Sequence, residues 1–183
     1  KPVLKQELYE PADTMVFPGL YGGKNWPPAS YSPDTHMLYI PTTEWGTRFI
    51  RRDGEGRPGT MDLGGIPQFD TTGTGWVVAF DMLSGEIAWQ KEMPGNFNWA
   101  GTLSTGGGLV FSGAPDGQVY AMNDETGEVL WKFQTGSGIY APPTSFTIDG
   151  KQYLGVASGT RNPVTRAGVA TGIATGNYIL FSL

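Results

Sequence analysis

Cysteine is absent from the 183 residues of the chain, and histidine occurs only once. The absence of cysteine excludes disulfide bonds, thiolate metal sites and covalent haem attachment through Cys-X-X-Cys-His within this chain. Long apolar runs are also lacking, because no stretch approaches the roughly 20 residues that a membrane-spanning helix requires. No segment keeps the period of an amphipathic helix over about 10 residues. These absences together predict a β-rich chain without a membrane span.

The charge balance and the composition narrow the possible functions further. The 17 acidic and 12 basic side chains give a net charge of −5, which argues against non-specific binding to nucleic acid or to an anionic membrane surface. With 28 glycines, 14 prolines and 13% aromatic residues, the chain has the frequent turns and large side chains typical of β-structure. Its length is that of one domain with ample apolar surface for a core.

One motif occurs twice at a fixed distance. Residues 79–89 and 121–131 both follow the pattern Ala-X-(Asp/Asn)-X-X-(Ser/Thr)-Gly-Glu-X-X-Trp, so that Trp89 and Trp131 are 42 positions apart. A repeat of this period is the sequence mark of a propeller, a solenoid or an array. In each copy a short apolar run leads into an Asp/Asn, Ser/Thr and Gly turn, and a second apolar run ends in the tryptophan. Each copy is therefore predicted to be a β-hairpin whose indole packs against a neighbouring unit.

The repeat divides the chain into rounds of four strands. The last round has only three, which makes eleven predicted strands and an all-β arc of about three propeller blades, the third incomplete. Propellers close with about four to eight blades, so we expect this chain to be part of a larger ring. The start at Lys1, without an initiator methionine, is typical of a processed or excerpted chain. The predicted segments are a connecting segment 1–19, blades 20–93 and 94–135, and an incomplete blade 136–183.

Chain tracing places a site at one end of this arc. In an up-and-down blade, the segment before the innermost strand and the loop after the second strand lie on the same face. Asn25-Trp26 and Asn98-Trp99 precede the predicted innermost strands, which places them near the central axis. Two long segments follow second strands and should surround the same site: 44–74, which is too irregular to be predicted as a strand, and 159–176.

Several motifs, taken in order, resemble those of the pyrroloquinoline-quinone-dependent alcohol dehydrogenases. These are eight-bladed quinoproteins of the methanol and ethanol dehydrogenase type, and the resemblance covers most of the chain. It implies a periplasmic enzyme that oxidises an alcohol, passes two electrons to the quinone and then passes them singly to a cytochrome c. This chain would supply blades six to eight. The motifs are Gly-Gly-Lys-Asn-Trp-Pro-Pro at residues 22–28, the two tryptophan repeats, and residues 106–113, 135–139 and 149–153.

The same resemblance implies which residues contact the cofactor. Asn25 and Trp99 match positions that hydrogen-bond the quinone in this family, and Trp26 and Asn98 are their neighbours. The loop around Asn162 is similar to one that gives a further contact. The residues that ligate calcium or a lanthanide in this family, and its catalytic base, have no counterpart in this sequence. No catalytic or metal-binding residue is therefore assigned in this chain. We expect them on a complementary N-terminal chain or segment that completes the propeller.

Two alternatives remain open at this stage. Asn-Trp before a strand can also be a turn asparagine followed by a packing tryptophan. A non-catalytic propeller, acting as a scaffold or binding protein, could be built from the same tryptophan repeats. Trp89 and Trp131 are predicted to be structural in either case, and His36 is predicted to be solvated at the far end of a strand.

Overall fold

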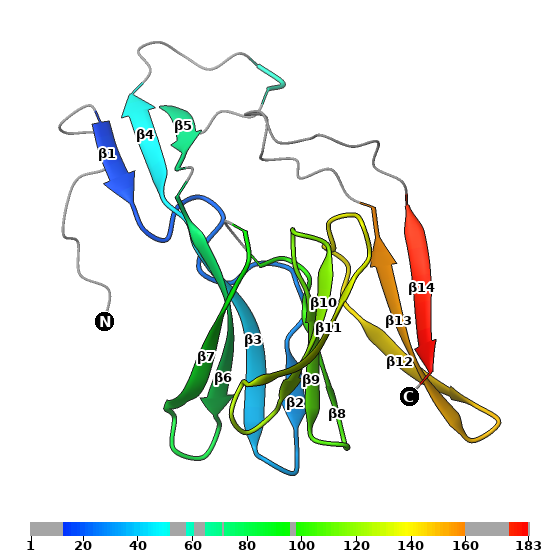
Figure 1. Ribbon diagram of the computed structural model, residues 1–183. Coiled ribbons are helices and arrows are strands. Elements are labelled where there is room, and N and C mark those ends of the chain that lie inside the picture. Colours follow the sequence, from blue (N-terminus) through cyan, green and yellow to red (C-terminus); the bar gives the residue numbers. More distant parts are fainter. Residues whose placement is uncertain are drawn as a thin grey trace.

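The chain is built from strands throughout the part that the computed structural model describes, and the all-β class is confirmed (Figure 1). Within these residues no helix is long and apolar enough to cross a membrane. The described residues are 13–51, 58–60, 65–70, 72–95, 98–159 and 176–182.

Eleven of the 14 strands form three antiparallel sheets that follow one another along the chain (Figure 1). The first sheet has the order β2 (Ser30–Ser32), β3 (Met37–Glu44), β6 (Thr74–Asp81) and β7 (Ile87–Met93). The second has the order β8 (Thr102–Thr105), β9 (Leu109–Gly113), β10 (Gln118–Asn123) and β11 (Val129–Gln134). The third has the order β12 (Thr144–Ile148), β13 (Lys151–Ser158) and β14 (Asn177–Ser182).

The three sheets pack face to face, with the second sheet in the middle. Successive residues of a strand point to opposite faces, so β6 buries Val77 and Ala79 against the second sheet and turns Val78 outward. The middle strands β9 and β10 are buried on both faces. Two cores result. The first contains Tyr39, Val77, Ala79, Met93, Val110, Ala114, Tyr120 and Met122, and the second contains Ala100, Phe111, Val119, Ala121, Ile139, Leu154 and Val156.

The inner strands β2 and β8 are joined across the first two sheets by Thr102. Its backbone N–H donates to the Pro28 carbonyl at 3.1 Å, and its hydroxyl donates to the Tyr39 carbonyl at 2.9 Å. The same hydroxyl oxygen accepts from the Ser30 backbone N–H at 3.0 Å. One buried side chain therefore fixes how the innermost strands of neighbouring sheets lie against each other.

The tryptophan of the first repeat, Trp89, links the outer strand of the first sheet to the second sheet. Trp89 in β7 donates from Nε1 to the Asp124 carbonyl of the next sheet at 2.8 Å. Its indole covers Gly127, where an added Cβ would lie 2.5 Å from Trp89 Cε3. Gly127 also has a φ of 71°, which L side chains rarely adopt. The position therefore has two independent reasons to be glycine.

A fourth sheet corrects two expectations from the sequence. It has the order β1 (Asp13–Val16), β4 (Thr47–Arg51) and β5 (Gly65–Phe69), and lies beyond the end of the first sheet (Figure 1). The prediction that segment 44–74 holds no strand is wrong, and the connecting segment 1–19 also contains a strand. The run from Thr47 to Arg51 contains Phe and Ile, which favour strands. Its pairing partner β1 is too distant in sequence for local pattern to reveal it.

Two buried tyrosines predict how stability depends on pH. Burial raises the pKa of Tyr140 to about 12, and burial together with the Asp116 carboxylate raises the pKa of Tyr120 to about 12. An unfolded tyrosine loses its proton near pH ~10, so the unfolded state binds fewer protons than the folded state between about pH 10 and about pH 12. The free energy of unfolding should therefore fall across this window. Urea denaturation of wild type, Tyr140→Phe and Tyr120→Phe at several pH values measures the slope. Both variants should show a shallower slope, and two unchanged slopes would contradict the prediction.

Candidate functional site

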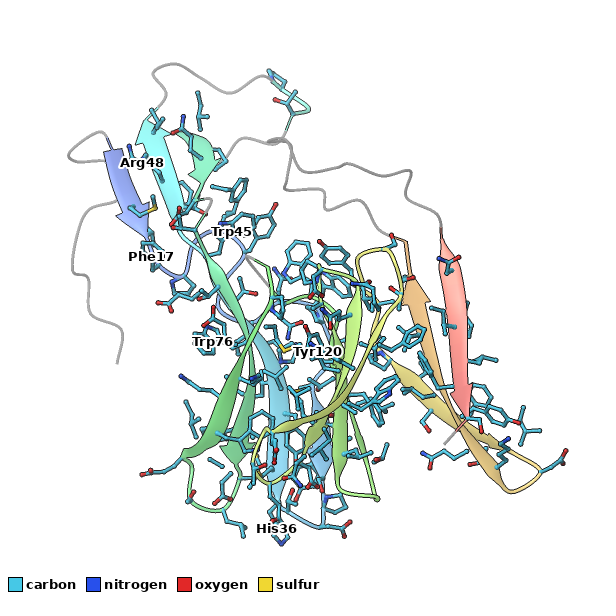
Figure 2. The ribbon with its side chains drawn as sticks, in the orientation of Figure 1. Phe17, His36, Trp45, Arg48, Trp76 and Tyr120 are labelled. Atoms are coloured by element: carbon cyan, nitrogen blue, oxygen red, sulfur yellow. The ribbon has the colours of Figure 1, made fainter. Side chains whose placement is uncertain are left out.

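The segments that precede the inner strands meet the first long loop at one end of the sheets. Tyr21 stacks on Trp45 with ring centroids 5.5 Å apart and on Phe69 at 4.8 Å, and meets the edge of Trp99 at 5.2 Å. Figure 2 shows Trp45 at this end and His36 at the opposite end. The lead segments and the loop that contains Trp45 and Phe69 thus share a face, as chain tracing predicts.

Two of the predicted site residues, Trp26 and Trp99, form an aromatic pair on this face. The rings of Trp26 and Trp99 lie 6.2 Å apart at an interplanar angle of 64°. Trp26 is 59% exposed, whereas Trp99 is half-buried between Trp26 and Tyr21. An indole this exposed contributes little to the core, but it can offer its ring to a planar ligand.

The side chain of Asn25 lies beside this aromatic pair and is positioned by two hydrogen bonds. Its Nδ2 donates to the Tyr21 carbonyl at 2.9 Å, and its Oδ1 accepts from the Trp26 backbone N–H at 2.7 Å. Because Nδ2 carries two hydrogens, one N–H of this exposed side chain can still donate to a ligand. The Lys24 ammonium donates to the carbonyls of Asn25 (2.7 Å) and Pro27, which fastens the turn and places a cation beside the asparagine.

Asn98 has a different environment from Asn25. It is 1% exposed, its Nδ2 donates to the Trp76 carbonyl at 3.1 Å, and its Oδ1 accepts from the Ala100 backbone N–H at 3.3 Å. Its backbone N–H donates to Thr43 Oγ1 at 3.4 Å. The side chain thereby fixes the backbone from which Trp99 projects. A direct contact between Asn98 and a cofactor stays a prediction.

The remaining predicted contact, Asn162, lies outside the described residues. The start of its loop is described: the Gly159 backbone N–H donates to the Gly138 carbonyl at 3.1 Å. This hydrogen bond brings the end of β13 beside the lead segment of the third sheet. That lead carries Ile139 and Tyr140, both buried.

Four aromatic residues of this face were missed by the sequence analysis. Trp45 and Tyr140 are 3% and 6% exposed, and Tyr21, Phe69 and Trp99 pack against them. A signal for Tyr140 was available, because it precedes the third inner strand as Trp26 and Trp99 precede the first two. Trp45 and Phe69 had no such signal, since Trp45 precedes β4 and Phe69 ends β5, two strands that the sequence did not predict.

Acidic and histidine side chains are dispersed over the part of the chain that the structure describes. These residues contain no group of three or more His, Cys, Asp or Glu side chains that could hold a metal ion. The described site offers aromatic faces, an amide donor and a cation.

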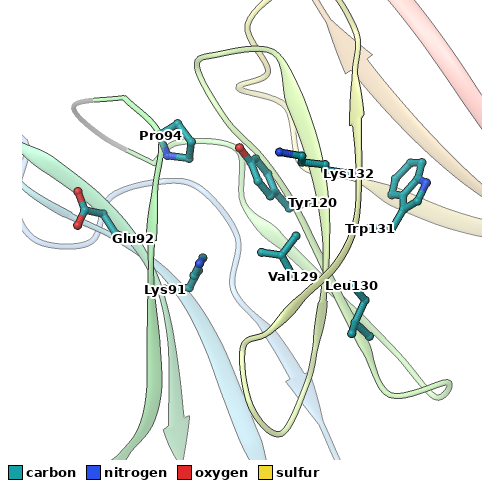
Figure 3. Close-up of a pocket in the computed structure, with 8 residues that line it drawn as sticks. All are labelled: Lys91, Glu92, Pro94, Tyr120, Val129, Leu130, Trp131 and Lys132. Carbon is teal, nitrogen blue, oxygen red and sulfur yellow. The ribbon is translucent and has the colours of Figure 1, made fainter.

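A groove of about 590 Å³ lies away from this face, between the outer strands β7 and β11. Lys91 and Lys132 stand on its two sides and Val129 lies between them, with the Tyr120 hydroxyl nearby (Figure 3). That hydroxyl donates to Asp116 Oδ2 at 3.2 Å. The groove is the open outer gap between two sheets, and none of the predicted site residues lines it.

The chain has relatives among known proteins. The family PQQ_2, described as outer membrane protein assembly factor BamB, matches residues 73–174, which is more than half of the chain. A quinoprotein ethanol dehydrogenase of Pseudomonas putida is 41% identical over 149 residues, or 79% of this chain. Two solved structures cover similar shares: the quinohemoprotein alcohol dehydrogenase of Comamonas testosteroni (80%, TM-score 0.70, 30% identity) and a europium-containing methanol dehydrogenase (82%, TM-score 0.72, 32% identity).

The match covers only part of each relative. The aligned segment is 23% of the ethanol dehydrogenase, 24% of the quinohemoprotein and 27% of the methanol dehydrogenase. The chain thus spans about a quarter of the length of the relatives that it matches. The propeller-like arc of packed antiparallel sheets is common to this chain and to those structures.

Proposed function

Because the chain belongs to the PQQ_2 family, we propose that it is a propeller segment of a quinoprotein alcohol dehydrogenase. In this proposal the whole protein oxidises an alcohol to an aldehyde or ketone with bound pyrroloquinoline quinone, passes the electrons to a cytochrome c and works in the periplasm. The names of three relatives support the activity: a quinoprotein ethanol dehydrogenase, a quinohemoprotein alcohol dehydrogenase and a methanol dehydrogenase.

The observation that carries the proposal is the meeting of Trp26, Trp99 and Asn25 on one face. Pyrroloquinoline quinone is a planar ring system with three carboxylates, and it takes up the two electrons that the alcohol loses. Such a group needs aromatic surface, N–H donors and positive charge around it. The indoles of Trp26 and Trp99 provide the surface, Asn25 provides a free amide N–H, and Lys24 lies beside it.

Each residue takes a stated role in this proposal. Asn25 donates to an oxygen of the quinone, and Trp99 and Trp26 contact its ring system. Asn98 supports Trp99 through its bonds to the Trp76 carbonyl and the Ala100 N–H, beside the direct contact that its position predicts. Asn162 adds a contact from the second long loop.

The metal ion and the catalytic base belong elsewhere in this proposal. One related structure is named as containing europium, and we propose that calcium or a lanthanide is ligated by residues outside this chain. A complementary N-terminal chain or segment supplies those ligands together with the earlier blades. The substrate is a small alcohol that enters from the face where Trp26 and Asn25 are exposed.

The alternative is a non-catalytic propeller, because the description of the matched family names an assembly factor. A scaffold requires the repeats and their packed tryptophans. It does not require an exposed indole such as that of Trp26 beside the amide of Asn25. The exposure of Trp26 therefore favours the enzyme.

An absorption spectrum of the native protein tests the proposal. A bound quinone adds a near-ultraviolet band that leaves the protein on denaturation, and an artificial dye acceptor should then be reduced when alcohols are supplied. A screen of short and long alcohols with this dye would define the substrate. A spectrum of protein alone, with no alcohol-dependent dye reduction after quinone and calcium or a lanthanide are added, would instead establish the scaffold.

A further inference from the structure

The groove between the outer strands β7 and β11 has both of its sides in this chain. Lys91, Glu92 and Pro94 line it from the first sheet and the segment after β7, and Tyr120 and residues 129–132 line it from the second sheet. Its volume of about 590 Å³ is within the range of about 300–1,000 Å³ that is usual for small-molecule sites. The groove is therefore large enough for a small organic molecule.

Two lysines extend into this groove from its opposite sides. Lys91 is paired with Val77 across β6 and β7, and Lys132 is paired with Tyr120 across β10 and β11. Directly paired residues of antiparallel strands lie on the same face of their sheet. Val77 and Tyr120 both belong to the first core, between the two sheets. Lys91 and Lys132 therefore lie along the outer edge of this core, with Tyr120 between them (Figure 3).

The positive charge of the two lysines is not neutralised within the described part of the chain. Neither ammonium group forms an ion pair or a hydrogen bond with a described residue. Alternation along β7 turns Glu92 to the opposite face from Lys91, and Figure 3 shows its carboxylate directed away from the groove. The nearby Asp116 carboxylate already accepts hydrogen bonds from the Tyr120 hydroxyl at 3.2 Å and from the Gln118 backbone N–H at 2.9 Å.

The floor of the groove between the two lysines is apolar. Val129 packs against the first core, and Tyr120 beside it is 7% exposed. The Tyr120 hydroxyl directs its hydrogen to Asp116, so the ring offers its apolar surface to the groove. A ligand that complements this arrangement has an anionic group for the lysines and an apolar part for the floor.

We propose that the groove binds a small organic anion that carries a carboxylate or phosphate group on an apolar body. Its anionic group accepts hydrogen bonds from the Lys91 and Lys132 ammonium groups, and its body covers Val129 and Tyr120. Because the groove is lined by none of the predicted quinone contacts, the proposal holds for an enzyme and for a scaffold alike. The bound anion links the first sheet to the second and should therefore stabilise the folded protein.

Calorimetric titration of the native protein at pH ~7 tests the ligand chemistry. Four probes are compared: octanoate, octyl phosphate, octanamide and inorganic phosphate. One of the two organic anions should bind saturably, and the stronger one identifies the anionic group. Octanamide lacks the charge and inorganic phosphate lacks the apolar body, so each should bind at least about tenfold more weakly. Saturable binding of neither organic anion, or equal binding of octanamide or inorganic phosphate, would overturn the proposal.

Three lysine substitutions test where the organic anion binds. Lys91→Gln and Lys132→Gln each remove one ammonium group and should each raise Kd about five- to tenfold. Lys151→Gln removes the same charge from an exposed lysine of the third sheet, over the Tyr153 ring, so it controls for net charge and should leave Kd unchanged. An unchanged Kd in both groove variants, or an equal rise in Lys151→Gln, would overturn the proposal.

A second measurement needs no variant. A saturating organic anion should slow the acetylation of Lys91 and Lys132 by N-acetoxysuccinimide several-fold in the native protein, whereas the rate for Lys151 should stay the same. Peptide mass spectrometry gives the three rates. Acetylation of both groove lysines at the same rate with and without the anion would show that it binds elsewhere and would overturn the proposal.

Discussion

A Trp89→Ala variant is expected to lose about 3 kcal/mol of the free energy of unfolding, the lower end of the range for Trp→Ala substitutions in a core, because its indole is partly buried. The substitution removes the indole that lies on Gly127, the hydrogen bond from Nε1 to the Asp124 carbonyl and the ring contact with Tyr39 at 5.8 Å. It also leaves a gap between the first two sheets, where the Tyr39 hydroxyl still reaches the Asp124 carbonyl at 3.1 Å. Equilibrium urea denaturation measures the loss.

The chain provides its own matched control for this prediction. Trp131 has the same place in the repeat but is 40% exposed and lies on aromatic side chains instead of a turn glycine. We expect Trp131→Ala to cost about half as much, because less apolar surface is removed from burial. Trp89→Phe should cost about 1 kcal/mol, which is the net worth of the lost hydrogen bond. Equal losses for Trp89→Ala and Trp131→Ala would contradict a special role for the docked indole.

Quinone binding should respond most strongly to two substitutions at the candidate site. Asn25→Ala removes an amide donor and would leave a quinone oxygen without its partner, at a cost of about 1–3 kcal/mol, or roughly 5- to 150-fold in Kd. Trp99→Ala removes the ring that stands between Trp26 and Tyr21, and we expect at least about a tenfold rise in Kd from lost aromatic contact. Titration of the apo-protein with pyrroloquinoline quinone gives both values.

Two further variants separate cofactor contact from structural damage. Trp99→Phe keeps the aromatic packing against Tyr21 and should recover most of the affinity that Trp99→Ala loses. Trp131→Ala, in the outer strand β11, should leave the affinity for the quinone unchanged. If neither Asn25→Ala nor Trp99→Ala alters the affinity while both remain folded, these residues do not contact the cofactor.

Much of this architecture could be predicted from local sequence. The pairing of a tight turn with apolar runs on both sides, repeated at 42 residues, predicts the hairpins that end in Trp89 and Trp131. The observed strands β6 with β7 and β10 with β11 are those hairpins. Strand order in the second sheet follows from its short connections, because consecutive antiparallel strands pair. For the same reason the lead segments of Asn25 and Asn98 could be assigned to one face.

Contacts between residues that are far apart in the sequence could not be predicted in this way. The strand β4 pairs with β1, and Asn25 and Asn98 have the same preceding-strand position but opposite exposure. A hairpin turn restricts its own φ and ψ angles, so its residue types indicate it directly. The pairing of distant strands and the burial of a residue against another sheet depend instead on contacts with residues far away in the sequence.

The sequence by itself determined the all-β class, the repeat, and the placement of the Asn25-Trp26 and Asn98-Trp99 segments on one face. Only the tertiary structure decided that Asn98 fixes the backbone beside Trp99 and that Trp99 joins a cluster with Trp45 and Tyr140. It also decided that, among the described residues, Gly127 is covered by an indole while nothing covers Gly85. The physical reason is that turn and strand preferences act within a few residues. Burial and docking depend on the close packing of side chains that are distant in the sequence, such as Trp89 and the Asp124 carbonyl, which are 35 positions apart.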